Sequence, residues 1–72
     1  MTSSIQLLDV VALTQDLPAK RLLRGQVGTV VEILAASMFE VEFFDDQGRT
    51  YAQLPIPAHQ LLVLHYQPQQ AA

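Results

Sequence analysis

The chain has 72 residues, half of them hydrophobic and 15% charged, which allows one small globular domain and excludes both a two-domain protein and a disordered chain. Four Lys or Arg against seven Asp or Glu give a net charge of -3, so the overall field repels polyanions and argues against general nucleic-acid binding. The sequence has no cysteine, which excludes disulfides, thiolate metal sites and cysteine nucleophiles.

The first residues and the length of the apolar runs indicate the cellular location. Met1 is followed by Thr2 and two serines, with no basic stretch ahead of an apolar run, so this segment does not resemble a signal peptide. The apolar run 61–64 is far shorter than the roughly 20 residues that cross a bilayer. We therefore expect a cytoplasmic protein that has no membrane partner.

Short apolar runs separated by turn signals predict five β-strands rather than helices. The first strand is predicted from Leu7 to Leu13. Residues 14–26 break the pattern, because Pro18 fixes its own φ and basic residues gather there, so we expect one long loop. The second strand follows the glycine-containing turn 25–28 and continues to residue 34 with many β-branched side chains.

The third predicted strand, 38–44, alternates apolar and acidic residues. Its phenylalanines and valine at odd positions are predicted to face the core, and Glu40 and Glu42 to face solvent. The segment from Asp45 to Gly48 indicates a tight hairpin, in which Gly48 takes a positive φ.

The fourth strand is predicted to begin at Arg49 and to end at residue 53 or 54. Pro55 and Pro57 are expected to stop it, because proline cannot donate a hydrogen bond to a ladder. One helical turn over residues 57–60 is then expected, with proline at its first position.

The last strand is predicted over residues 61–66. Five short antiparallel strands, a long first loop and one helical turn before the last strand indicate an all-β fold, a small five-stranded SH3-like barrel. This single domain is expected to span residues 5–66, between a disordered N-terminus, 1–4, and a disordered tail, 67–72.

The core prediction depends on the register of the second strand. Val30 and Val31 are both apolar, and a bulge at Gly28 would exchange which of them faces inward. The residues predicted to contribute most of the core are Val10, Val11, Val27, Val31, Ile33, Phe39, Val41, Phe43, Leu61 and Val63.

Two resemblances bear on the fold. Residues 9–13, followed by the long loop and by Gly25, Gly28 and Val30 at the spacing Gly-x-x-Gly-x-Val, resemble the KOW motif of SH3-like domains. The basic and aromatic residues that RNA-binding KOW domains carry after this motif do not follow Val30. From Ile5 to Tyr66 the chain is also similar to a small bacterial family, domain-of-unknown-function family 4926, which implies a fold but no activity. This similarity rests on the segments LLDVVAL, RGQVGTVVE, EVEF, DDQGRTYA and LLVLH.

Two groups of residues are candidates for binding. Lys20, Arg21 and Arg24 carry three of the four positive charges, and this cationic patch either solvates a loop whose leucines pack on the barrel or binds a partner. Phe44 and Tyr51, one on each arm of the predicted hairpin, either pack or form a recognition surface.

Catalytic and metal-binding patterns are not found. Glu40 and Glu42 project in parallel from one strand, and the turn 45–48 is too short for an EF-hand loop, so no metal is expected. His59 and His65 lack the spacing of a shared metal site, and the sequence has neither a nucleophile motif nor a phosphate-binding loop. We therefore expect no cofactor and a protein that is not an enzyme.

Two functional classes remain open. The acidic net charge and the small number of cations favour a protein-interaction module of unknown specific role, with the product of a neighbouring gene among the candidate partners. The alternative is a weak RNA-binding module of the KOW kind. Both faces of the first and last predicted strands are apolar, and this excess predicts a homodimer.

Overall fold

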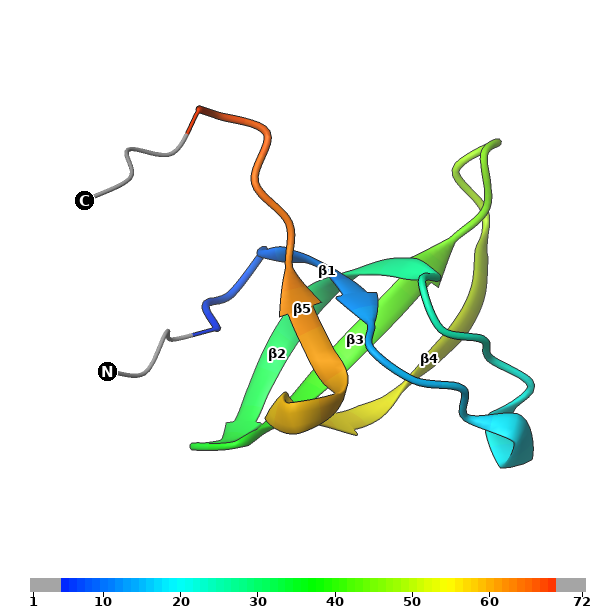
Figure 1. Cartoon of the computed structure of the whole chain (residues 1–72), viewed down its shortest axis with the longest axis horizontal. Helices are drawn as coiled ribbons and strands as arrows, with labels where there is room; N and C mark the ends of the chain where they lie inside the picture. Colours follow the sequence, from blue (N-terminus) through cyan, green and yellow to red (C-terminus); the bar gives the residue numbers. More distant parts are fainter. Residues whose placement is uncertain (1–4, 69–72) are drawn as a thin grey trace.

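The computed structural model describes residues 5–68, which form one antiparallel five-stranded sheet (Figure 1). The predicted disordered N-terminus, 1–4, and residues 69–72 of the predicted disordered tail lie outside the described residues. The strands are β1 (Val10–Leu13), β2 (Val27–Ala35), β3 (Met38–Phe44), β4 (Thr50–Pro57) and β5 (Leu61–Val63), with single 3-10 turns at η1 (Pro18–Lys20) and η2 (Ala58–Gln60).

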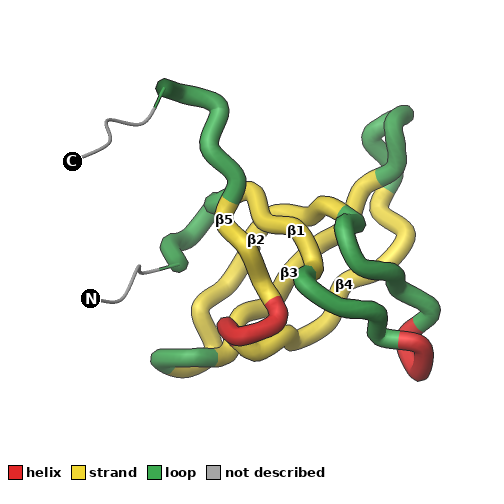
Figure 2. The backbone as a smooth tube through the Cα atoms, viewed as in Figure 1, coloured by secondary structure: helices red, strands yellow, loops and turns green. Residues whose placement is uncertain are grey.

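The strand order in the sheet is β4-β3-β2-β1-β5, and every neighbouring pair is antiparallel. The sheet curls, so that β1 and β5 lie in front of β2 and β3 with the core between them (Figures 1 and 2). The all-β class with five strands and a helical turn before the last strand is confirmed. β4 and β5 are the two edges of the described sheet, so its closure into an SH3-like barrel stays a prediction.

β3 supplies the centre of the core. Phe39, Val41 and Phe43 are all buried, whereas Glu40 and Glu42 are only half-buried on the other face. β3 lies between β2 and β4, so the side chains of its inner face are enclosed by neighbours on both sides. The alternation predicted for this strand is confirmed.

The rest of the predicted core is corrected by the structure. Val27 and Ile33 are exposed, so their assignment to the core is wrong. Val10, Val31 and Val63 are only partly buried. The central apolar cluster instead includes Leu13, Leu22, Val30 and Ile56.

A bulge in β2 explains why Val30 and not Val31 belongs to the core. Val30 pairs with Val41 and Glu32 pairs with Glu40, so Val31 is an extra residue without its own partner on β3. The bulge therefore lies at Val31 and not at Gly28, and it leaves Val30 facing the core. A second register shift follows between Ile33 and Ala35. Two such shifts bend a strand strongly, and the end of β2 leaves the core.

Gly28 brings β2 close to β3. It is buried and pairs with Phe43, and a Cβ placed on it would lie 2.7 Å from the Glu42 carbonyl oxygen. Because Gly28 faces inward, the neighbouring Val27 faces outward, which accounts for its exposure.

β4 continues through both prolines, so the prediction that they stop the strand is wrong. The Ala58 N–H donates to the Ser37 carbonyl oxygen at 2.9 Å, and the alternation of an antiparallel ladder then turns the nitrogens of Pro57 and Pro55 toward the open edge. No ladder hydrogen bond is lost there, because β4 is an edge strand.

Two strands are shorter than predicted. β1 begins at Val10 and not at Leu7, because Leu8 has a φ of 72°, which interrupts the extended backbone. The Leu64 N–H still donates to the Val10 carbonyl oxygen at 2.9 Å. β5 ends at Val63 and not at Tyr66, because β1 has no residue before Val10 with which a longer β5 could pair.

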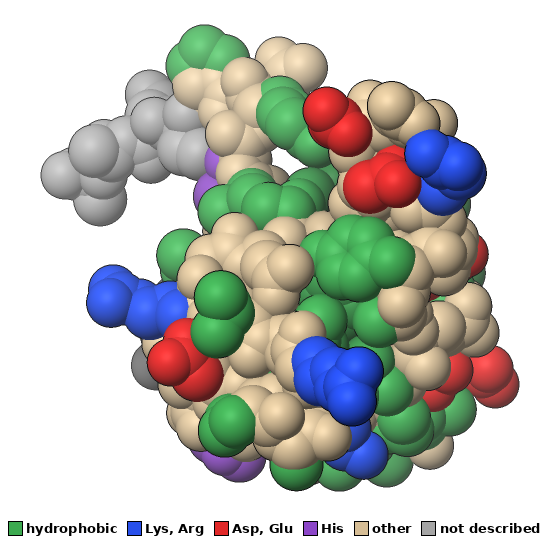
Figure 3. All heavy atoms as spheres, turned by 90° about the vertical axis from the view of Figure 1, so that its right-hand side faces the viewer, with side chains coloured by type: hydrophobic (Ala, Val, Ile, Leu, Met, Phe, Trp, Pro, Cys, Tyr) green, Lys and Arg blue, Asp and Glu red, His purple; other side chains and the backbone are tan. Residues whose placement is uncertain are grey.

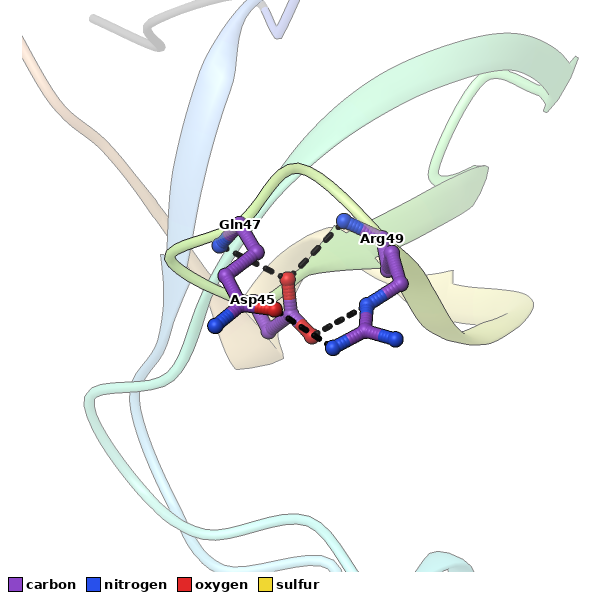
Figure 4. A network of polar contacts seen from close by, with 3 residues as sticks. All are labelled: Asp45, Gln47 and Arg49. Atoms are coloured by element: carbon purple, nitrogen blue, oxygen red, sulfur yellow. Dashed lines mark hydrogen bonds and ion pairs between the residues drawn. The ribbon is translucent and has the colours of Figure 1, made fainter.

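The β3–β4 hairpin is set by its own side chains (Figure 4). One carboxylate oxygen of Asp45 accepts hydrogen bonds from the N–H groups of Gln47 and Arg49, each at 2.9 Å. Gly48 has a φ of 79°, as predicted. The Arg49 side chain lies 3.7 Å from the other Asp45 oxygen and donates to the Gln47 side chain, so this cation is held at the turn.

Candidate functional site

The long loop, residues 14–26, is an ordered arm of the sheet, and we call it the arm. Leu17 and Leu22 form an antiparallel bridge with backbone hydrogen bonds of 2.8 and 3.2 Å. Between them the chain makes the 3-10 turn η1, and Arg21 closes this turn with a φ of 60° and an N–H that donates to the Pro18 carbonyl oxygen. The arm therefore has a hairpin-like backbone of its own.

Further contacts attach the arm to the sheet. Leu22 is only 1% exposed and belongs to the core cluster. The Arg24 N–H donates to an Asp16 carboxylate oxygen at 2.8 Å, which ties the two sides of the arm together. The Gly25 N–H donates to the Leu13 carbonyl oxygen at 2.8 Å. The base of the arm is thus fixed to β1.

The three cations of the arm lie at different points along it. Lys20 and Arg21 are exposed at its tip, and Arg24 is exposed near its base. Within residues 5–68, the one ion pair is that between Arg49 and Asp45, so none of the three arm cations is paired there. Figure 3 shows Lys and Arg side chains at several points on the face where the arm and the hairpin lie, with hydrophobic side chains between them.

The two candidate aromatic residues are not brought together. Tyr51 is 46% exposed, its hydroxyl accepts a hydrogen bond from the Gln26 side chain at 3.2 Å, and its ring centroid lies 6.2 Å from that of Phe43. Phe44 pairs with Thr50, which makes Tyr51 the extra residue of a bulge. Phe44 follows the inward-facing Phe43 and points to the outer face of the sheet. Tyr51 therefore contacts the arm, whereas Phe44 lies on the outer face.

Leu23 completes the surface around the arm. It follows the buried Leu22 and is 61% exposed, so the interpretation that all the arm leucines pack on the sheet is wrong for this one. The exposure of Leu23 could have been predicted from the sequence, because two neighbouring residues of an extended segment face opposite ways. We define the arm face as Lys20, Arg21, Leu23, Arg24 and Tyr51.

The acidic residues of β3 form pairs with neighbouring side chains. A Glu40 carboxylate oxygen accepts from the Gln53 amide at 3.2 Å, and Glu42 accepts from the Thr50 hydroxyl. Residues 5–68 contain no group of three or more His, Cys, Asp or Glu placed to hold a metal ion. Among these same residues no helix is long and apolar enough to span a membrane. The absence of a metal and of catalysis stays a prediction.

Comparison with known proteins places the chain in a family. Neither a curated protein nor a solved structure matches it. A family model described as "Domain of unknown function (DUF4926)" matches residues 7–63, a range that contains all five strands and the arm. Since this range covers most of the 72 residues, the chain belongs to the family of the domain of unknown function DUF4926.

Proposed function

We propose that the protein is a non-catalytic protein-interaction module whose arm face binds an acidic segment of a partner protein. The observation that carries this proposal is the contrast between a fixed backbone and free side chains in the arm. Its backbone is held by the Leu17–Leu22 bridge and by the buried Leu22, whereas Lys20, Arg21 and Arg24 are exposed and unpaired within residues 5–68. A surface that is already ordered loses less entropy when it binds.

Charge supports an acidic partner. The chain has a net charge of -3, yet three of its four Lys or Arg lie on the arm, so the positive charge that would attract a negatively charged segment is concentrated there. Such a field speeds association and selects the partner more than it strengthens the complex. Contact area would come from Leu23, which is exposed between these cations in the sequence, and from Tyr51, which is exposed and contacts the arm through Gln26.

The chemistry of the arm face favours a protein over RNA. Three phosphate contacts would give a logarithmic salt dependence of only about -2 for a single strand, which describes weak and indiscriminate binding. Tyr51 is the one aromatic residue of the arm face, and its hydroxyl is hydrogen-bonded to Gln26, whereas single-strand binders stack successive bases on several aromatic rings. We therefore propose a protein partner, and the experiment below distinguishes it from RNA.

The test is affinity capture from a lysate of the native cell with the full chain as bait. The wild type is compared with the variant Lys20→Ala/Arg21→Ala/Arg24→Ala, and Arg49→Ala is the control because it removes the one Lys or Arg outside the arm. We expect a stoichiometric protein partner that is kept by the control and lost by the triple variant. A further variant, Leu23→Ser, should weaken a protein partner and leave RNA capture unchanged.

Two results would overturn the proposal. RNA that co-purifies with the wild type and is lost from the triple variant would establish the alternative. A protein partner retained in full by the triple variant would show that binding occurs elsewhere on the molecule.

A further inference from the structure

The two edges of the sheet differ in their capacity to pair with another strand. An edge strand presents unpaired N–H and carbonyl groups, and prolines on the edge are a common protection against pairing. β4 has this protection, because Pro55 and Pro57 direct their nitrogens to its open side. β5 contains no proline.

The open edge of β5 carries a defined set of backbone groups. The Leu64 N–H donates to the Val10 carbonyl oxygen, and the alternation of the ladder then turns the backbone of Leu62 toward β1 and that of Leu61 and Val63 toward the open side. The Leu61 N–H is already used, because it donates to the carbonyl oxygen of the first residue of η2. The open side thus offers the Val63 N–H and the carbonyl oxygens of Leu61 and Val63.

The charge distribution favours a second copy of this chain as the partner at this edge. Residues 60–68 contain no Asp, Glu, Lys or Arg, whereas the β4 side of the sheet ends in a hairpin that carries Asp45 and Asp46. Two copies with a net charge of -3 repel each other over most of their surfaces. At the β5 edge they can meet without placing carboxylates opposite one another.

We propose that β5 pairs antiparallel with β5 of a second copy about a two-fold axis, with Val63 opposite Val63. This register lets the two Val63 residues exchange both backbone hydrogen bonds. It also places each Leu61 carbonyl oxygen opposite the N–H of His65 of the second copy. The Leu61 N–H, already bonded within its own chain, is not needed for this pairing. The interface is isologous, which gives a closed dimer and not a fibre.

The side chains suit the same register. Leu62, which is 57% exposed, lies on the outer face of the sheet beside Ala12, and Ala12 in turn pairs with Val27. Pairing at Val63 sets Leu62 next to Leu64 of the second copy, and the reverse contact forms across the two-fold axis. The dimer would therefore extend an apolar row that already runs over three strands of each copy.

The test measures the mass of the full chain in solution from micromolar to millimolar concentration. We expect the wild type to shift from monomer to dimer, and the amide exchange of Val63 to slow as the dimer forms. Val63→Pro removes an N–H that faces the open edge and no hydrogen bond of the ladder with β1, so it should keep that ladder and abolish the dimer. The matched control is Gln53→Pro, which removes an outward N–H from β4 and should leave the dimer intact.

Val63 is partly buried against the core, so a second variant guards against loss of folding. Leu62→Glu changes an exposed side chain and places a carboxylate beside Leu64 of the second copy, and it should also give a monomer. A wild type that stays monomeric throughout, or a dimer unaffected by Leu62→Glu, would overturn the inference. So would a dimer lost equally in Gln53→Pro. The arm variants leave this edge unchanged, so the result is independent of the proposed function.

Discussion

Gly28→Ala should destabilise the protein through a collision with the backbone of β3. A Cβ on Gly28 would lie 2.7 Å from both the Glu42 carbonyl oxygen and Val41 Cγ1, and 3.1 Å from Phe43 Cδ2. Contacts below 3.0 Å force something to move. The carbonyl oxygen cannot move away like the end of a flexible side chain, because it belongs to the ladder that joins β2 and β3.

The expected loss is about 1–3 kcal/mol in the free energy of unfolding, the usual cost of an extra methyl group in a packed core. For 72 residues the total stability is on the order of 4–11 kcal/mol, so the shift is a large part of it. Equilibrium urea unfolding followed by circular dichroism measures it.

Gly48→Asn is the matched control. Gly48 has a positive φ, which asparagine tolerates better than other side chains, and nothing lies within 4 Å of the position that a Cβ would take there. We expect this variant to unfold near the wild-type midpoint. A Gly28→Ala protein with the stability of the wild type would refute the reasoning, because β2 and β3 could not then be as close as the geometry requires.

The remaining predictions also concern the free energy of unfolding, measured in the same assay. Phe43→Ala should cost about 3–5 kcal/mol, because this side chain is fully buried at the centre of the sheet. Val30→Ala should cost roughly 1.5 kcal/mol or more and Val31→Ala distinctly less, because only Val30 is fully buried; the reverse order would place the bulge elsewhere. Asp45→Ala should cost about 1–2 kcal/mol through two lost hydrogen bonds at the turn, and an unchanged midpoint would contradict that.

β3 and its hairpin were predictable because local rules determine them. The alternation of Phe39, Val41 and Phe43 with glutamates fixes one buried face whichever strands lie beside it. Asp45 forms the hairpin turn through contacts within four residues, and Gly48 supplies the positive φ. Neither feature needs information from a distant part of the chain.

β2 was less predictable because its bulge depends on the partner strand. Val30, Val31 and Ile33 are all β-branched and all suit a buried strand position. Which of them faces the core is decided by the pairing of Glu32 with Glu40, since this leaves Val31 as the extra residue. That choice buries Val30. Ile33 pairs with Phe39 and is exposed because the bent end of β2 leaves the core.

Strand order explains the error at the prolines. Pro55 and Pro57 would end a strand in the middle of a sheet, where every N–H has a partner. β4 is an edge strand, and both nitrogens face its open side. The position of a strand within a sheet depends on all the other strands, so it could not be read from the segment that contains the prolines.

Part of the candidate site could also be predicted from nearby sequence, whereas another part depends on contacts between distant residues. Lys20, Arg21 and Arg24 could be recognised because a loop segment five residues long holds all three, and a loop exposes its charged side chains whatever its path. Tyr51 joins them through a hydrogen bond to Gln26, 25 residues away, and through a bulge at the start of β4. The same bulge separates it from Phe44. A binding surface that combined both aromatic residues would require a regular β4 at that point. Substitutions of Phe44 should therefore affect binding at the outer face of the sheet, and substitutions of Tyr51 should affect binding at the arm.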